Sequence, residues 1–346
     1  MLITVGKVAI TVSAIVIIGS HINFGFFESH RHKLSAVTAI VTLIFLASQV
    51  SIIAGLRLKL ILDAVGQRCP LPTTVQVALS GFFFEQVAFG FVGGDAMRLW
   101  LLHRTDVPLR SAVEAIVIDR FFGLAGLMLL AGVGLPGLVA LLTGFHWLSV
   151  VGAGLVAVAI GAVLAFLLLP RIARWLPPTV VAEIKSLIRA ARDNPGVRNN
   201  LLTAFSLAAA THCMNIIVFL LLGRDLGISL TLWQWFLIVP PALLISMLPI
   251  SAGGWGLREA SFVVGLAGFG IRPEEAILPP IIFGLGVLAV TLPGGVIWLI
   301  NRKRAARESA AGLAEAQADE GAGETAAGSD SAETERSHRQ ELMRLS

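Results

Sequence analysis

The chain has 346 residues, of which 56% are hydrophobic and only 14% are charged. A soluble globular domain carries about 25% charged residues, so the composition excludes one and indicates a polytopic membrane protein. The formal net charge of +4 suits anionic lipid head groups, and nothing in the sequence indicates a nucleic-acid partner.

Runs of about 20 apolar residues predict membrane-spanning helices. We place them near residues 2–20, 36–56, 111–142, 147–169, 200–222, 230–250 and 276–300. The first run has one basic residue, Lys7, and no small-residue cleavage site after it, so we expect a retained helix, with a cleaved signal peptide as the alternative. The predicted fold class is all-α, an integral membrane bundle of about seven or eight transmembrane helices with one or two re-entrant or broken segments.

Loop charge predicts the topology of the first half. The positive-inside rule assigns the basic segments to the cytoplasm. These segments are residues 57–68, 98–110, 171–198 and 302–307. A single crossing by residues 71–92 would put the basic segments on either side of it on opposite faces of the membrane. We therefore predict that 71–92 is a re-entrant hairpin, which turns near Gly81 to Glu85.

The second half is harder to assign. For residues 255–271 we favour a short broken crossing before the full span 276–300, with a second re-entrant loop as the alternative. Residues 177–194 have apolar residues at helical spacing and predict an amphipathic helix, which either lies on the cytoplasmic leaflet or packs on the ends of the bundle. Residues 1–301 would form the membrane domain, and residues 302–346 a disordered cytoplasmic tail.

A short pattern occurs twice in the chain, as VGGDAMRLW and as AGGWGLREA. Each copy reads Gly-Gly-x-x-x-Arg and closes an apolar stretch. Helix-breaking backbone at membrane depth is tolerated where it is buried in protein or lines a cavity, and ionisable groups there are usually functional. The pattern comprises Gly93, Gly94 and Arg98 in the first copy and Gly253, Gly254 and Arg258 in the second.

Further charged residues fall inside predicted membrane segments. Glu85 is near the midpoint of the predicted hairpin, where an unpaired carboxylate costs about 3 kcal/mol. Asp119 and Arg120 lie roughly 14 Å into the span that starts near Arg110, about half-way through the hydrocarbon core. All three side chains need partners.

Two interpretations of these charges are open. In the functional one, arginines hold a phosphate group, backbone N–H groups at the Gly-Gly turns approach the same anion, and the acids keep the empty site neutral and carry a coupling proton. In the structural one, neighbouring charges form ion pairs that only hold helices together: Asp95 with Arg98, Asp119 with Arg120, and Arg258 with Glu259. We favour the functional interpretation, because small apolar residues would serve for packing alone.

The motifs GGDAMR, SAVEAIVIDRFFGL and LPISAGGWGLREA resemble, in order and spacing, the transmembrane domain of the lysylphosphatidylglycerol synthase family, a flippase-like domain. The likeness covers roughly residues 1–301. Longer relatives carry a soluble aminoacyl-transferase domain after this one, and we expect no synthase activity here. One departure stands out, since relatives commonly show an Arg-Trp pair after the second helix, where this chain has Arg57 followed by Leu58.

The resemblance implies a domain that translocates lipid, with a site on the matching motif positions. The implied lining is Gly93, Gly94, Asp95, Arg98, Asp119, Arg120, Gly253, Gly254, Arg258 and Glu259, to which the residue chemistry adds Glu85. The partner would be a membrane lipid with an anionic head group. A homo-oligomer is compatible with the sequence.

We therefore predict a multi-pass protein of the bacterial inner membrane, with a cytoplasmic C-terminus, that translocates an anionic or polyprenyl-phosphate-type lipid. No catalytic residue, cofactor or metal site is expected. Cys69, in a polar loop, and Cys213, in an apolar span, should be free thiols. The alternatives are a membrane enzyme acting on a lipid phosphate, with Asp95, Asp119 or Glu259 as base or nucleophile, and a non-transporting accessory subunit of an envelope lipid pathway.

Overall fold

The computed structural model describes residues 35–87, 91–142, 178–248 and 254–302. Within these ranges the chain forms helices and connecting turns without any strand, which confirms the all-α fold class. The predicted spans 2–20 and 147–169 and the tail from residue 303 lie outside the described residues. The chain divides into two compact units, residues 1–295 and 296–346. Of the second unit only 296–302 are described, and they are helical.

In the described ranges, four helices are long and apolar enough to cross a membrane. They are Ala36–Ala64, α7 (Leu109–Leu142), α11 (Pro195–Asp225) and Pro273–Arg302, which begins with α14 (Pro273–Ala276). The first comprises α3 (Ala36–Ser48), the π-helical segment η1 (Gln49–Ile53) and α4 (Ala54–Ala64). It extends eight residues beyond the predicted span 36–56, so Arg57 lies within a helix and not in a loop.

A pair of short helices, α5 (Leu71–Val87) and α6 (Phe91–His103), follows the first long helix. With 17 and 13 residues they fall short of the length of about 20 that a full crossing needs, and they pack against each other. A hairpin over this segment agrees with the charge-based prediction. The turn is placed differently, because α5 remains helical through Gly81 and Glu85 and ends only at Val87.

A second pair, α12 (Leu232–Ser246) and α13 (Leu257–Ala267), has the same form with 15 and 11 residues. Antiparallel packing follows from two contacts: a Cβ on Gly254 would lie 2.8 Å from the Ser246 carbonyl oxygen, and one on Gly265 would lie 2.9 Å from Ile238 Cγ2. The favoured assignment was therefore wrong here. α12, within the predicted span 230–250, and α13, within 255–271, are the two legs of a hairpin, which agrees with the re-entrant alternative and not with a crossing by 255–271.

The two hairpins open at opposite ends of the helix Ala36–Ala64. Gln67 Nε2 donates to Ser111 Oγ at 3.3 Å, which joins the turn before α5 to the start of α7. We call this the basic end. The Ser35 amide donates to Asp225 Oδ2 at 2.8 Å, which joins the start of α3 to the end of α11, from which α12 follows. We call this the Ser35 end.

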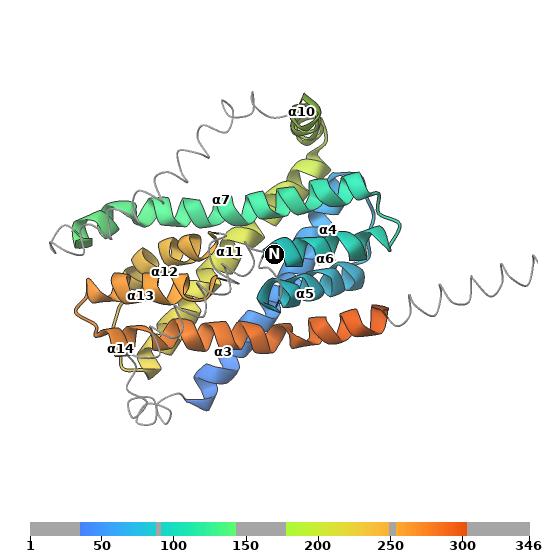
Figure 1. The fold of residues 1–346 in the computed structure, drawn as a ribbon. Helices are drawn as coiled ribbons and strands as arrows, with labels where there is room; N and C mark the ends of the chain where they lie inside the picture. The colour runs from blue at the N-terminus through green and yellow to red at the C-terminus, as the bar shows by residue number, and fades with distance from the viewer. Residues whose placement is uncertain (1–34, 88–90, 143–177, 249–253, 303–346) are drawn as a thin grey trace, which may run out of the picture. The chain divides into compact units, whose positions relative to one another are not determined.

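The described helices thus form two halves of like design and opposite direction (Figure 1). Each half is a long helix, a short-helix hairpin and a second long helix: Ala36–Ala64, α5–α6 and α7 in one, and α11, α12–α13 and Pro273–Arg302 in the other. The first half enters its hairpin from the basic end and the second from the Ser35 end. This is the pattern of an inverted-topology repeat, which is common among secondary transporters.

Each hairpin has its own apolar core. Buried side chains of α4, α5, α6 and α7 surround the first, among them Ile61, Val77 and Leu102. Around the second, the Phe219 ring stacks on Phe262 and Phe283 with centroids 4.3 and 4.8 Å away. These buried side chains pack the short helices closely against the long ones.

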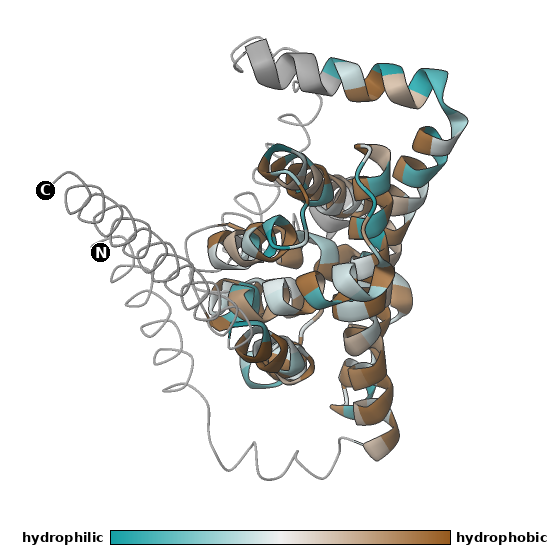
Figure 2. Ribbon diagram, turned by 90° about the vertical axis from the view of Figure 1, so that its right-hand side faces the viewer, coloured by the Kyte–Doolittle hydropathy of each residue, from teal (hydrophilic) through white to brown (hydrophobic). Residues whose placement is uncertain are grey.

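The long helices contain many apolar residues, which Figure 2 colours brown. Polar residues are more frequent in α10 (Pro178–Asp193), at the top of that view. Its boundaries agree with the predicted amphipathic helix 177–194. Lys185, Arg189 and Ile188 are all exposed there.

Candidate functional site

Six charged side chains from four helices meet in the first half of the molecule. Their positions are Arg57 on α4, Glu85 on α5, Asp95 and Arg98 on α6, and Asp119 and Arg120 on α7. Three are cations and three are carboxylates, so the network is neutral when all are ionised. We refer to these six residues as the ion network.

Two arginines of the network are firmly held. Arg57 binds Asp119 with two hydrogen bonds, from Nε to Oδ1 at 2.5 Å and from Nη2 to Oδ2 at 3.0 Å. Arg120 donates from Nη2 to Asp95 Oδ1 at 2.8 Å and to Glu85 Oε2 at 3.1 Å, and its Nε donates to both Asp95 oxygens at 3.1 Å. Asp119 and Arg120 therefore turn to different partners, not to each other, because adjacent residues on a helix point about 100° apart.

Arg98 is the most buried cation of the network and the most loosely held. It is only 4% exposed. Its Nη1 donates to Asp95 Oδ1 at 3.2 Å, while Nη2 lies 3.9 Å from Glu85 Oε2 and Nη1 lies 4.0 Å from Asp119 Oδ2. Its guanidinium also lies over the Phe82 ring, 4.8 Å from the centroid. Among the described residues it makes one hydrogen bond, which leaves most of its donors for a ligand.

Glycines make room for this arrangement. A Cβ on Gly81 would lie 2.4 Å from Arg98 Nε, and a Cβ on Gly94 would lie 2.7 Å from the Gly81 carbonyl oxygen. Gly93 and Gly94 lie in the first turn of α6, so the first Gly-Gly pair is not the turn of the hairpin. The role we can assign to Gly94 is close packing of α5 and α6.

The second Gly-Gly copy is built differently. Gly253 lies outside the described residues. Gly254 and Gly256 have φ angles of 79° and 87°, in the left-handed region that favours glycine. Glu259 Oε2 accepts from the Gly256 amide at 2.6 Å, and its Oε1 accepts from Arg258 Nη2 at 2.6 Å. The carboxylate of Glu259 thus already occupies the start of α13, where the sequence suggested an external anion.

The two arginines of the repeated pattern do not meet in this structure. Arg258 lies against the Trp255 ring, and a Cβ on Gly284 would lie 2.2 Å from its Nη2. The α5 leg of the first hairpin reaches the same long helix at Gly294, whose carbonyl accepts from Ser80 Oγ at 3.1 Å. Ten residues separate the two glycines, or about 15 Å along the helix. Glu85, Asp95, Arg98, Asp119 and Arg120 come together, and Gly254, Arg258 and Glu259 form a separate group.

Arg57 was not among the predicted site residues, because the Arg-Trp pair common in relatives is absent here. The sequence did contain a signal, because a cation directly after an apolar span needs a partner if the helix continues. Gln49 was also missed: its side chain is 6% exposed, and its Nε2 lacks a hydrogen-bond partner among the described residues. It opens the π-helical segment η1, a feature frequent at functional sites.

Polar residues of α11 complete the interior. His212 Nε2 lies 2.9 Å from the Gly123 carbonyl oxygen, a hydrogen bond that joins α11 to α7. Asn215 Oδ1 is buried without a partner in the described part of the chain. Within that part, no group of three His, Cys, Asp or Glu side chains is placed to hold a metal ion.

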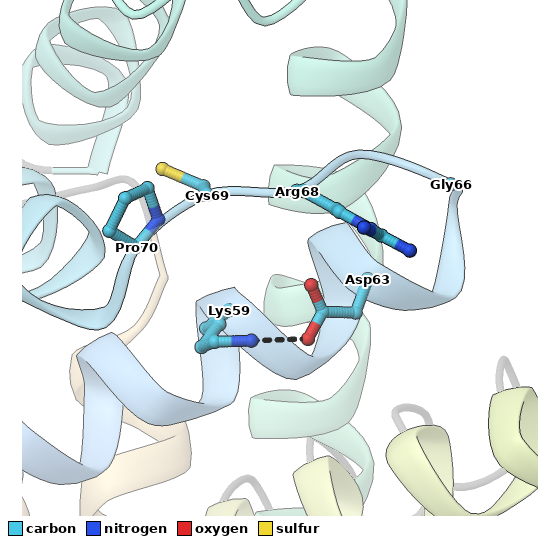
Figure 3. Close-up of a pocket in the computed structure, with 6 residues that line it drawn as sticks. All are labelled: Lys59, Asp63, Gly66, Arg68, Cys69 and Pro70. Carbon is cyan, nitrogen blue, oxygen red and sulfur yellow. Dashed lines mark hydrogen bonds and ion pairs between the residues drawn. The ribbon is translucent and has the colours of Figure 1, made fainter.

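A pocket of about 770 Å³ opens where the first hairpin begins (Figure 3). Its lining is Lys59, Asp63, Gly66, Arg68, Cys69 and Pro70. Lys59 Nζ donates to Asp63 Oδ2 at 2.5 Å, and the Arg68 side chain extends past Asp63 while the Cys69 sulfur points away from it. Cys69 and Cys213 are both free thiols, the first buried and the second exposed.

Comparison with known proteins identifies the domain. The family model described as the lysylphosphatidylglycerol synthase TM region matches residues 5–295, which is most of the chain. The chain belongs to this family. The match covers the ion network, both hairpins and both Gly-Gly copies, so the resemblance seen in the motifs extends over the whole described bundle up to Gly295.

One curated relative is named glycosyltransferase AglD and comes from Haloferax volcanii. It is 27% identical over 286 residues, which cover 70% of this chain and 45% of the relative. The chain therefore spans less than half the length of that protein. The family match supports a multi-pass membrane protein.

Proposed function

We propose that this member of the lysylphosphatidylglycerol synthase TM region family translocates a membrane lipid whose head group carries a phosphate, either an anionic phospholipid or a polyprenyl phosphate. The proposal rests on the position of Arg98. It is a buried guanidinium, held by one hydrogen bond, at the meeting point of three helices. A planar guanidinium with free donors is well suited to bind phosphate oxygens in pairs.

The opposed hairpins support movement as well as binding. In inverted-repeat transporters, substrate sites lie near the bilayer midplane at broken helices, and the two halves exchange roles as access alternates. Here each half contributes a hairpin that enters from its own end and carries one copy of the Gly-Gly-x-x-x-Arg pattern. Arg98 packs on Gly81 of α5, whereas Arg258 packs on Gly284 of the last helix, which suggests that the two arginines serve the head group at different depths.

The pocket at the basic end supplies a route for the head group. Lys59 and Arg68 line it, and it adjoins the turn into α5, at the mouth of the first hairpin. Under the positive-inside rule this end faces the cytoplasm, where anionic lipids meet basic residues. A lipid from the inner leaflet would reach the ion network from this side.

The test is lipid movement in reconstituted vesicles. Fluorescent phosphatidylglycerol and a labelled polyprenyl phosphate would be followed from leaflet to leaflet, with phosphatidylcholine as the zwitterionic comparison. Arg98→Lys keeps the network neutral but loses the paired donors, so we expect movement of the anionic lipids to slow about 10- to 100-fold. Arg110→Lys, at an exposed position with a 74% exposed side chain, is the matched control. Equal rates for Arg98→Lys and the unaltered protein would contradict the proposal.

A second candidate is an accessory role in glycosyl transfer, which the name of the Haloferax volcanii relative favours. In that case the protein would dock on an enzyme or a membrane surface through α10 and would not itself move lipid. Neutralising Lys185, Arg189 and Arg192 would then impair the pathway more than Arg98→Lys does. Measuring both sets of variants in the same vesicle and cell assays separates the two functions.

A further inference from the structure

The ion network presents an electrostatic problem for any anion that enters it. Three arginines and three carboxylates already balance, and Arg98, Glu85 and Asp119 are each less than a tenth exposed. A phosphodiester that binds Arg98 adds a negative charge to a buried, neutral group. Uncompensated charge at this depth is expensive, and such groups neutralise by taking up or releasing protons.

We propose that lipid binding at Arg98 is coupled to the uptake of one proton by Glu85. This inference rests on the proposed function, because it assumes that a phosphate-bearing lipid is the ligand. In the empty site Glu85 is a carboxylate balanced by Arg120 and Arg98. When Arg98 turns to the phosphate, Glu85 accepts a proton from water at one Oε and the network with its ligand is again neutral.

The contacts single out Glu85 among the three carboxylates. Asp119 keeps both hydrogen bonds from Arg57, and Asp95 keeps three from Arg120. Glu85 has one hydrogen bond, from Arg120 Nη2 at 3.1 Å, which the same nitrogen shares with Asp95, and one longer contact of 3.9 Å to Arg98. When Arg98 turns away, Glu85 is left with this one shared hydrogen bond, whereas Asp119 and Asp95 keep two and three.

The surroundings of Glu85 leave no other described group for this role. Asp95 and Arg98 face it from α6, Asp119 and Arg120 from α7, and Arg57 lies behind Asp119 on α4. The long helix that packs on α5 at Gly294 and Gly295 has no charged residue between Glu275 and Arg302. The Glu85 side chain is also less exposed than that of Asp95, at 10% against 26%, so water stabilises its charge less.

Calorimetry on the purified full-length protein tests the proposal. Short-chain phosphatidylglycerol would be titrated in two buffers of different ionisation enthalpy, which counts the protons taken up per lipid bound. We expect about one, with affinity that rises about tenfold for each pH unit lowered through the range where the proton is taken up. Because binding takes up a proton, acid must favour it.

Two variants locate the proton. Glu85→Gln mimics the protonated carboxyl, so it should bind lipid with no proton uptake and with an affinity that does not change with pH. Glu114→Gln, on α7 but outside the network, should behave as the unaltered protein. Proton uptake that persists in Glu85→Gln and is lost instead in Asp95→Asn would overturn the assignment to Glu85.

The proton count on the unaltered protein tests the coupling between lipid binding and proton uptake even if a variant fails to fold. Lipid binding through Arg98 without proton uptake would overturn this inference and leave the proposed function standing. Failure to bind any phosphate-bearing lipid would overturn both, whether or not glycerol phosphate binds. Binding of free glycerol phosphate as tightly as of the lipid would identify a soluble phosphate as the ligand, against a membrane lipid.

Discussion

At the scale of single residues, Arg98 depends on its neighbours for its position as much as for its charge. Gly81 leaves the space that its Nε occupies, the Phe82 ring lies beside its guanidinium, and Asp95 holds one Nη. Cation–π contacts of this kind contribute about 0.5 to 2 kcal/mol when desolvated. A residue with so few hydrogen bonds is therefore oriented largely by packing.

Gly81→Ala tests this orientation. A Cβ at 2.4 Å would force Arg98 aside, and we expect anionic lipid binding to weaken about tenfold or more, with about 1 to 3 kcal/mol lost in unfolding free energy. Gly132→Ala is the control, because nothing lies within 4 Å of its added Cβ. Binding assays and thermal unfolding of both variants provide the comparison; equal effects would show that Arg98 is not held in this way.

The thiol of Cys69 gives a second residue-scale prediction. Burial raises its pKa above the ordinary value, and a hydrogen bond with Thr105 only partly opposes this. A raised pKa means less thiolate at neutral pH, so we expect slow reaction with a water-soluble maleimide that accelerates as the pH rises. His103→Cys in a background lacking both native cysteines is the exposed comparison. Equal rates at neutral pH would contradict the expected burial.

At the scale of elements, hydropathy and charge predicted the helical segments 36–56, 111–142, 200–222 and 276–300 and the position of the first hairpin. They could not distinguish a short hairpin leg from a full span in 230–250, because α12 is as apolar as a crossing helix and differs only in where it ends. The end at Ser246 depends on the packing of α13 through Gly254 and Gly265, which no local pattern reveals. The pairing of charges in the ion network could not be predicted from local sequence either, because Arg57 and Asp119 are 62 residues apart.

The opposite orientation of the hairpins can be tested by labelling. In the background without native cysteines, Pro70→Cys and His103→Cys should react with an impermeant maleimide from one side of the membrane. Ser229→Cys and Arg272→Cys, near the mouth of the α12–α13 hairpin, should react from the other side. Intact cells and inside-out vesicles supply the two faces. Labelling of Ser229→Cys and His103→Cys from the same face would rule out the inverted arrangement.

At the scale of the whole molecule, two charged groups stabilise different parts of the bundle. The ion network joins α4, α5, α6 and α7, whereas Arg258 and Glu259 sit at the start of α13 with Trp255. Breaking one partner of a buried pair typically costs about 3 to 5 kcal/mol, because the other charge is left alone. Groups that are well separated should lose stability independently.

Double-mutant cycles measure this division. Arg57→Ala and Asp119→Ala should together cost less than the sum of the single changes, by about 1 to 3 kcal/mol, because the pair removes both charges. Arg57→Ala with Glu259→Ala should be additive within about 0.5 kcal/mol. Unfolding in mixed micelles provides the free energies. Strong coupling between Arg57 and Glu259 would show that the two groups interact, against the separation described above.

The π-helical segment η1 has a consequence for the direction in which Arg57 faces. A π-helical turn accommodates one residue more than an α-helical turn, so the residues after Ile53 are rotated by about 100° relative to an uninterrupted α-helix. A helical wheel drawn from α3 onward therefore points Arg57 to the wrong neighbour. Removing one residue between Gln49 and Ile53 would restore the ideal phase and turn Arg57 away from Asp119, although every charged residue would still be present.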